Sequence, residues 1–371
     1  MKPFSWSLIS SYALIAAGSP IGAPGTLLNG RETGMNSMLI RGGKRNETNG
    51  PCCSASISTD MLSTLKLYAQ YAGASYCNND AAVGSVVTCS GSACPDVNAA
   101  GATITATFAG SSTDIQGFVS TDATNQVIVV SVRGSHSIRN WITDFEFIQD
   151  DCSSLVSGCL VHSGFAKAWD EISDAVLSAV NTAKSSNPDY RIVFTGHSLG
   201  AAVSSLGAAY ARQSGLSVDI INYGSPRVGN AAWANYVSGQ DGDEWRVTHL
   251  DDPVPRLPPI VFNYAHTTPE YWLSDGSALT TDYTVSDVKE CDGVTSLGCN
   301  AATLGLDILA HLYYLGPISG CSPIELSFKK RQDQSDPLWW QATAPVTDVT
   351  DDELEAQLND WVQQDMNSTS S

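Results

Sequence analysis

The segment FTGHSLGAAV, which begins at Phe194, constrains the fold of this chain more than any other. It places Ser198 between two glycines. The apolar run Arg191–Thr195 before it is typical of a buried strand, and the Gly- and Ala-rich run Leu199–Arg212 after it predicts a helix. A serine at such a junction sits in a strained turn, and the glycines are needed because side chains there would collide with the strand and the helix. The bare pattern G-x-S-x-G is weak evidence, but this context predicts that Ser198 is a nucleophile.

A serine hydroxyl is a poor nucleophile unless a base removes its proton. In folds with this turn, an acid and then a histidine follow the serine along the chain. Three histidines come after Ser198. His249 lies in a predicted strand and His266 in a proline-rich connection, so we expect structural roles for both. His311 comes last, late enough to return to the edge of the sheet where the serine lies, and we expect it to be the base.

The predicted strand Trp245–His249 runs into two acids, Asp251 and Asp252, at the end where an orienting carboxylate is needed. Spacing alone does not decide between them. Another strand ends at the sequence RGS, so we expect Ser135 to offer its N–H and hydroxyl to a developing oxyanion. The N–H of Leu199, at the start of the predicted helix, is the expected second donor.

Large apolar side chains follow this loop at positions i, i+3, i+4 and i+7: Ile138, Trp141, Ile142 and Phe145. The spacing by itself favours an ordinary helix that faces the core. The short length, the bulky tryptophan and the position after the oxyanion loop favour a lid over an apolar cleft. Exposing ~300 Å² of apolar surface costs ~7 kcal/mol at ~25 cal/mol/Å², so such a lid stays shut in water and opens on lipid.

Strand and helix patterns alternate between about residues 55 and 325. The predicted strands are Ile104–Phe108, Ile115–Ser120, Val127–Val132, Arg191–Thr195, Val218–Asn222 and Trp245–His249. The predicted helices are Met61–Tyr71, Phe165–Val180, Leu199–Arg212 and Ala231–Val237. Strands and helices that alternate in this way predict an α/β fold with a mostly parallel sheet and right-handed crossovers.

The N-terminal residues 1–18 are typical of a secretory signal peptide, with Lys2 followed by the apolar run Leu8–Ala17 and small residues. That run is too short to span a membrane, which takes ~20 apolar residues. No later segment is apolar enough to do so. We therefore expect a secreted, extracellular protein. Its formal net charge of −19 argues against nucleic acid as a partner.

Two basic clusters flank the central region: Lys44-Arg45 and Lys329–Arg331. They are either solvated charge patches or sites for a dibasic-specific protease of the secretory pathway. The change in composition at the second cluster favours processing. Cleavage at both would release a propeptide, residues 19–45, and an acidic extension, residues 332–371, from a domain of residues 46–331.

The acidic extension carries about half of the net charge and contains no lysine or arginine. Its acids are Asp333, Asp336, Asp348, Asp351, Asp352, Glu353, Glu355, Asp360 and Asp365. The sequence TDDELEAQLNDWV predicts a helix whose capping box is Thr350 and Glu353. One face of this helix carries Leu354, Leu358, Trp361 and Val362. Such a face needs an apolar surface to cover. The sequence leaves three alternatives for that surface: the mouth of the site, a membrane, or no stable partner. Both N-glycosylation sequons, at Asn46 and Asn367, lie in the flanks.

Ten cysteines in an exported chain favour disulfides over metal binding. Short spacings predict local bridges, and the remaining distant cysteines predict a long-range one. The predicted pairs are Cys89–Cys94, Cys152–Cys159, Cys291–Cys299 and Cys77–Cys321. Cys52 and Cys53 stay unassigned. No histidine or cysteine pair has zinc-ligand spacing, so we expect no metal site.

Together these motifs resemble the class 3 triacylglycerol lipases of filamentous fungi over about Tyr76–Cys321. The matching stretches are YC at Tyr76, CSGSACP at Cys89, RGSHSIRNWI at Arg133, HSGF at His162, DYRIVFTGHSLG at Asp189, YGSPRVGN at Tyr223, RVTHLDDPVPRLPP at Arg246, EYW at Glu270 and AHLYYLG at Ala310. The resemblance implies a disulfide-bridged α/β-hydrolase fold, with a mostly parallel sheet flanked by helices. It also implies hydrolysis of triacylglycerol esters at the lipid–water interface.

Position by position, the resemblance makes Ser198 the nucleophile and His311 the base, and it selects Asp252 over Asp251 as the acid. It also implies Ser135 and Leu199 as the oxyanion donors and Ser137–Phe145 as the lid. Three of the predicted disulfides match those of the family: Cys77–Cys321, Cys89–Cys94 and Cys152–Cys159. The resemblance does not extend to the fourth, Cys291–Cys299. Neither a cofactor nor a stable protein partner is implied.

Other functions compete with triacylglycerol hydrolysis. Phospholipase A1 or mono- and diacylglycerol lipase activity depends on loop shape, which the sequence does not give. A feruloyl esterase needs a polar, open flap, and the apolar face within residues 138–145 argues against it. An inactive binding module is disfavoured because all three triad positions are filled. A latent zymogen is a further hypothesis, in which Leu354–Val362 packs over the lid until Lys329–Arg331 is cut.

Overall fold

An eight-stranded sheet forms the centre of the fold in the computed structural model, which describes residues 57–90, 93–135, 146–303, 307–321 and 351–368. Its strand order is β1-β2-β3-β6-β7-β8-β9-β10. The strands are β1 (Thr103–Ala109), β2 (Gln116–Asp122), β3 (Val127–Val132), β6 (Arg191–His197), β7 (Val218–Tyr223), β8 (Glu244–His249), β9 (Glu270–Leu273) and β10 (Val288–Cys291). Neighbours from β3 to β9 are parallel, whereas β1, β2 and β10 pair antiparallel. The sheet is therefore mostly parallel, as predicted.

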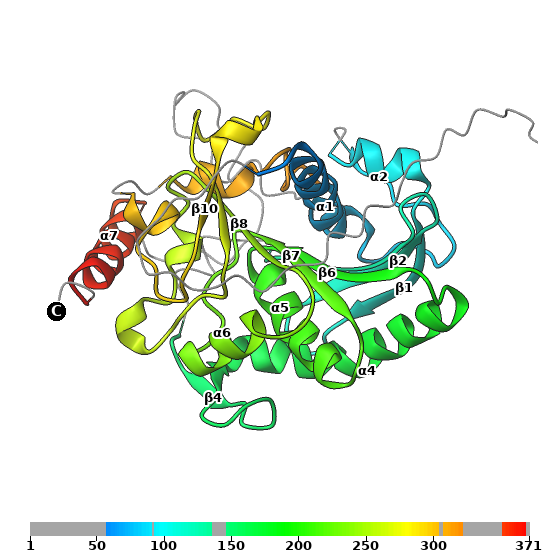
Figure 1. Cartoon of the computed structure of the whole chain (residues 1–371), viewed down its shortest axis with the longest axis horizontal. Coiled ribbons are helices and arrows are strands. Elements are labelled where there is room, and N and C mark those ends of the chain that lie inside the picture. The colour runs from blue at the N-terminus through cyan, green and yellow to red at the C-terminus, as the bar shows by residue number, and fades with distance from the viewer. Residues whose placement is uncertain (1–56, 91–92, 136–145, 304–306, 322–350, 369–371) are drawn as a thin grey trace, which may run out of the picture. The chain divides into compact units, whose positions relative to one another are not determined.

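Helices cover both faces of this sheet (Figure 1). Helix α1 (Thr59–Asn78) packs on one face, and α4 (Ser163–Ser186) and α5 (Leu199–Gln213) pack on the other. The shorter helix α6 (Ala231–Ser238) adds Trp233 and Val237 to the apolar core on the same side of the sheet as α4 and α5. Because both faces are covered, the central strand β3 is buried along its whole length, which explains why five of its six residues are valine or isoleucine.

Shorter elements surround the main layers. They are α2 (Pro95–Ala100), the hairpin β4 (Gln149–Asp151) and β5 (Leu160–His162), and the 3₁₀ turns η2 (Val254–Arg256), η3 (Ile260–Phe262), η4 (Val285–Asp287), η5 (Cys299–Ala302) and η6 (Ile308–Leu312). A last helix, α7 (Asp351–Ser368), lies in the acidic extension. No helix among the described residues is both long enough and apolar enough to cross a membrane.

The predicted elements agree with the observed ones apart from their ends, but several short elements were not predicted. Among them are helix α2 and strands β4 and β5. Every predicted strand is present, but β6 runs two residues further than predicted, through Gly196 and His197 to the turn. Strands β9 and β10 were not predicted, because each has only four residues. All four predicted disulfides are present: Cys77–Cys321, Cys89–Cys94, Cys152–Cys159 and Cys291–Cys299.

Candidate active site

The turn between β6 and α5 holds Ser198 in a conformation that non-glycine residues rarely adopt, with φ 59° and ψ −130°. The chain approaches itself so closely here that larger residues do not fit beside the serine. A Cβ at Gly196 would lie 2.5 Å from the carbonyl carbon of Gly200, and one at Gly200 would lie 2.1 Å from the carbonyl oxygen of Val132. The two glycines are thus required by backbone contact, and the turn has the geometry of a nucleophile elbow.

The structure brings His311 and Asp252 together, although they are 59 residues apart in the sequence. The imidazole Nδ1 lies 2.7 Å from the carboxylate Oδ2, and both side chains are fully buried. Because a carboxylate only accepts hydrogen bonds, Nδ1 carries the proton and Nε2 keeps a free lone pair. Asp252 also accepts from the N–H of Val254 at 2.9 Å and from the hydroxyl of Tyr314. Asp251, by contrast, is half-buried, and the carboxylate hydrogen-bonded to the imidazole is that of Asp252.

Two other histidines hold the backbone on either side of this imidazole. His197 Nε2 lies 2.8 Å from the carbonyl oxygen of His311, and His249 Nδ1 lies 2.7 Å from that of Ala310. Each nitrogen must donate, since carbonyls only accept, so the second nitrogen of His249 accepts from the Tyr283 hydroxyl. Burial lowers the pKa of both histidines, which keeps them neutral. They hold the backbone at His311, whose Nε2 has no hydrogen-bond partner among the described residues.

The loop after β3 lies directly beside Ser198. A Cβ at Gly134 would lie 3.2 Å from the Ser198 Cβ, so the next residue, the half-buried Ser135, is a neighbour of the nucleophile elbow. Leu199 is the first residue of α5, and its N–H therefore has no partner one helical turn earlier. Leu199 thus follows Ser198 directly, and Ser135 follows the glycine that lies against it. The predicted lid residues, Ile138, Trp141, Ile142 and Phe145, lie outside the described residues.

Two buried polar atoms in this region lack a partner among the described residues: Ser198 Oγ and His311 Nε2. Burying a polar atom without a hydrogen bond is costly and is rare in proteins. One is a hydroxyl that could donate and the other a nitrogen that could accept. This arrangement suits transfer of the hydroxyl proton to the nitrogen when a substrate binds beside them.

The sequence of this chain is similar to those of known lipases. Residues 129–262 match the family described as lipase (class 3), and residues 48–106 match the lipase 3 N-terminal region. The secreted mono- and diacylglycerol lipase 1 of Fusarium solani is 47% identical over 84% of this chain and 88% of its own length. This chain belongs to the class 3 lipases.

Solved structures of lipases have the same fold. The mono- and diacylglycerol lipase of Aspergillus oryzae superposes with a TM-score of 0.68 at 40% identity, over 71% of this chain and 100% of its own. A triacylglycerol lipase whose catalytic centre is a serine protease triad gives a TM-score of 0.63 at 30% identity, over 72% of this chain and 99% of its own. The protein is accordingly an α/β-hydrolase and a carboxylic ester hydrolase.

Some residues that build the site of this lipase were not predicted from its sequence. Asn300 donates from Nδ2 to the carbonyls of Leu250 and Asp252, at 3.0 Å each, and so fixes the loop that carries the acid. Tyr314 donates to Asp252 itself. The stretch AHLYYLG contains the tyrosine only three residues after His311, and that spacing was the available signal. Nothing in the sequence near Asn300 indicates its role.

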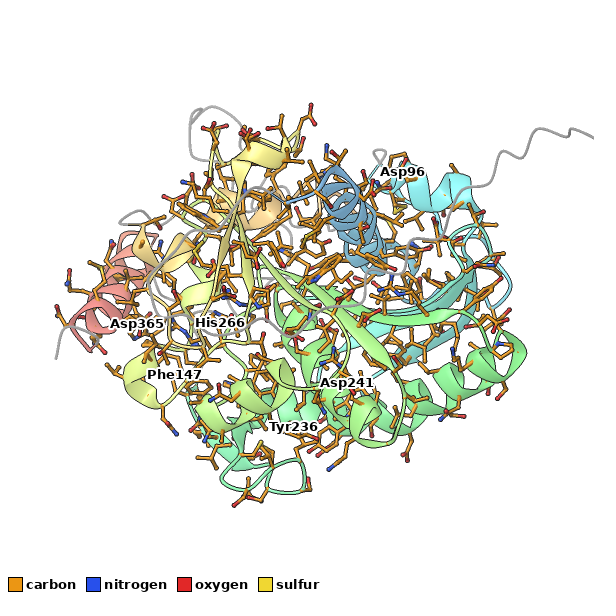
Figure 2. All side chains as sticks on the ribbon, viewed as in Figure 1. Asp96, Phe147, Tyr236, Asp241, His266 and Asp365 are labelled. Atoms are coloured by element: carbon orange, nitrogen blue, oxygen red, sulfur yellow. A yellow bond between two sulfur atoms is a disulfide. The ribbon has the colours of Figure 1, made fainter. Side chains whose placement is uncertain are left out.

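His266, the remaining downstream histidine, forms its hydrogen bond away from Ser198, Asp252 and His311. His266 Nε2 bonds to the carbonyl of Pro255, and Figure 2 shows the residue inside the fold. Burial lowers its pKa well below the usual value. Among the described residues one group has metal-ligand spacing, and its members are Cys77, Cys89 and Cys321. All three sulfurs are in disulfides, so none is available as a thiolate.

Proposed function

We propose that this secreted lipase hydrolyses acylglycerol esters through Ser198 as nucleophile, His311 as base and Asp252 as orienting acid. The observation that carries the proposal is the 2.7 Å contact between His311 Nδ1 and Asp252 Oδ2. It fixes the tautomer in which Nε2 accepts a proton. That nitrogen and the Ser198 hydroxyl are both buried, without a described partner, at a nucleophile elbow.

The reaction begins when His311 takes the hydroxyl proton as Ser198 Oγ attacks the ester carbonyl carbon. The oxyanion that forms accepts hydrogen bonds from the N–H groups of Ser135 and Leu199, and the dipole of α5 adds to its stabilisation. The imidazolium is stabilised by Asp252. It then gives its proton to the leaving alcohol, which leaves an acyl-enzyme. Water, deprotonated by the same imidazole, releases the fatty acid and restores Ser198.

The names of two relatives favour diacylglycerols and monoacylglycerols as substrates of this lipase. The Fusarium solani relative, at 47% identity, and the Aspergillus oryzae structure, at 40%, both carry the name mono- and diacylglycerol lipase. Triacylglycerol is the second candidate, because the apolar segment within residues 138–145 suits a lid that opens on lipid. The signal peptide predicted at residues 1–18 and the four disulfides support export to an oxidising, extracellular environment.

Hydrolysis of tri-, di- and monoacylglycerols with identical acyl chains tests this proposal, at concentrations spanning the solubility limit of each. We expect the highest kcat/KM on diacylglycerol, a rate that jumps once droplets form, and no hydrolysis by Ser198→Ala. A preference for triacylglycerol would favour the second candidate and keep the triad. Hydrolysis that survives in Ser198→Ala would reject the mechanism.

A further inference from the structure

Helix α7 of the acidic extension buries its inward face against the rest of the lipase (Figure 1). Leu358 is 2% exposed and joins an apolar cluster with Val254, Leu257 and Leu312. Trp361 packs at the edge of this cluster. The contact is therefore a built interface rather than a helix resting on a polar surface.

A buried ion pair anchors the same face of α7. Asp365 Oδ2 lies 2.7 Å from Arg227 Nη1, and the two side chains are only 6% and 3% exposed. The second carboxylate oxygen accepts from the N–H of Ile260, and Figure 2 shows Asp365 on the inward side of the helix. Arg227 is held in turn, because its Nη1 also donates to the carbonyls of Arg256 and Pro258. Fixed, charge-assisted contacts of this kind give a specific docking register.

The apolar surface that α7 covers directly adjoins two members of the triad. Val254 follows Asp252 by two residues and donates its N–H to that carboxylate. Leu312 follows His311 in the chain. The acyl chain of a lipid ester needs an apolar surface beside the serine, because water would otherwise remain around its methylene groups. In this structure the chain's own helix occupies the apolar surface next to Asp252 and His311.

We propose that α7 is an internal blocking segment, which occupies the apolar surface beside the triad in place of the substrate and is anchored by Asp365 and Arg227. This inference rests on the proposed function. It assigns the surface of Val254, Leu257 and Leu312 two alternative occupants: α7 in the intact chain and a lipid acyl chain once α7 leaves.

The sequence provides a way to release this segment. Residues 322–350 connect α7 to the domain, and the basic cluster Lys329–Arg331 lies in that connection. A tethered helix binds at an effective concentration of about millimolar, which is lost when the tether is cut. Cleavage at the cluster therefore converts a segment that always rebinds into one that is diluted away after dissociation.

Two matched variants of the full chain test the block. Asp365→Asn removes the charge of the anchor. Asp360→Asn makes the same chemical change on the same helix, but at an exposed residue that accepts a hydrogen bond from Gln364 one turn away. We expect Asp365→Asn to raise the rate on emulsified diacylglycerol about tenfold, as for loss of one charge-assisted hydrogen bond, and Asp360→Asn to leave it unchanged. Hydrogen exchange of the α7 amides should increase only in Asp365→Asn.

Cleavage supplies the second arm. Wild type and Asp365→Asn are cut at Lys329–Arg331 with a dibasic-specific protease, and the released extension is removed by gel filtration. The two cut enzymes should then share one raised rate, because the anchor no longer matters. Faster α7 exchange without a faster rate, or a rate that falls when the extension is removed, would overturn the block.

The Ser198→Ala variant, run in parallel, separates this inference from the proposed function. If that variant still hydrolyses the ester, the mechanism fails whatever the extension does. If it is inactive while cut and intact wild type hydrolyse at equal rates, the mechanism stands and the block is rejected.

Discussion

Gly224 lies against the imidazole of His311, and replacing it with alanine would displace the proposed base. Its φ is +56°, and a Cβ at this position would lie 2.9 Å from His311 Cε1 and 3.0 Å from Nδ1. Ordinary contacts of this kind are longer than 3.4 Å. The ring must therefore move by roughly 0.5 Å. This equals the largest displacement at which catalytic side chains keep their productive geometry. A displacement of about 1 Å costs about 100-fold, so Gly224→Ala should lower kcat/KM about tenfold, or about 1.4 kcal/mol.

The backbone cost of this substitution needs its own control. Gly101 also has a left-handed φ, +72°, but a Cβ there meets nothing within 4 Å. Both alanine variants should lose about 1 kcal/mol of unfolding free energy for the left-handed conformation. Only Gly224→Ala should lose activity. Urea unfolding and kcat/KM on a soluble short-chain ester measure the two effects separately. Suppose that Gly224→Ala loses the same unfolding free energy as Gly101→Ala but keeps the kcat/KM of the wild type. The position of His311 is then not set as we argue.

Three further predictions concern the acid, its tyrosine and a buried histidine. Asp252→Asn should lower kcat by about 10⁴, whereas Asp251→Asn should change it by less than about twofold; equal losses would show that the chosen acid is wrong. Tyr314→Phe should lower the unfolding free energy by about 2 kcal/mol in urea titrations, because it removes a hydrogen bond to a buried carboxylate; an unchanged midpoint would contradict that bond. Burial lowers the pKa of His162 to about 4, so its folded form resists protonation and stability falls as pH drops from about 6.5 to 4. His162→Gln should remove about 3 kcal/mol of the stability difference between pH 7 and pH 4, and an unaltered difference would count against the burial argument.

Local patterns predicted the central fold well because burial dominates there. Strand β3 (Val127–Val132) has the predicted bounds, and β6 and α5 flank Ser198 as the run of apolar, Gly and Ala residues indicates. The short strands β9 and β10 were missed because four residues give no clear periodicity. They are defined by pairing, β9 with β8 and β10 with β9, rather than by their own sequence.

The candidate site was only partly accessible from the sequence. The turn glycines locate Ser198, since their conformational need is local. The pairing of His311 with Asp252 crosses 59 residues, and chain order and family resemblance, not spacing, selected it. Asn300 and Tyr314 were missed because their roles come from contacts made after folding. The anchor Asp365 was missed too: among nine acids in the extension, only its contact with Arg227 distinguishes it.

Covalent labelling of Ser198 tests the central claim most directly. The intact lipase would be incubated with an organophosphonate ester that reacts with activated serines, in the presence of emulsified lipid, and the adduct would be located by peptide mass spectrometry. The account predicts a single adduct on Ser198, loss of hydrolysis in proportion to labelling, and slow labelling in Asp252→Asn. An adduct on another residue, or full hydrolysis by protein completely labelled at Ser198, would contradict it.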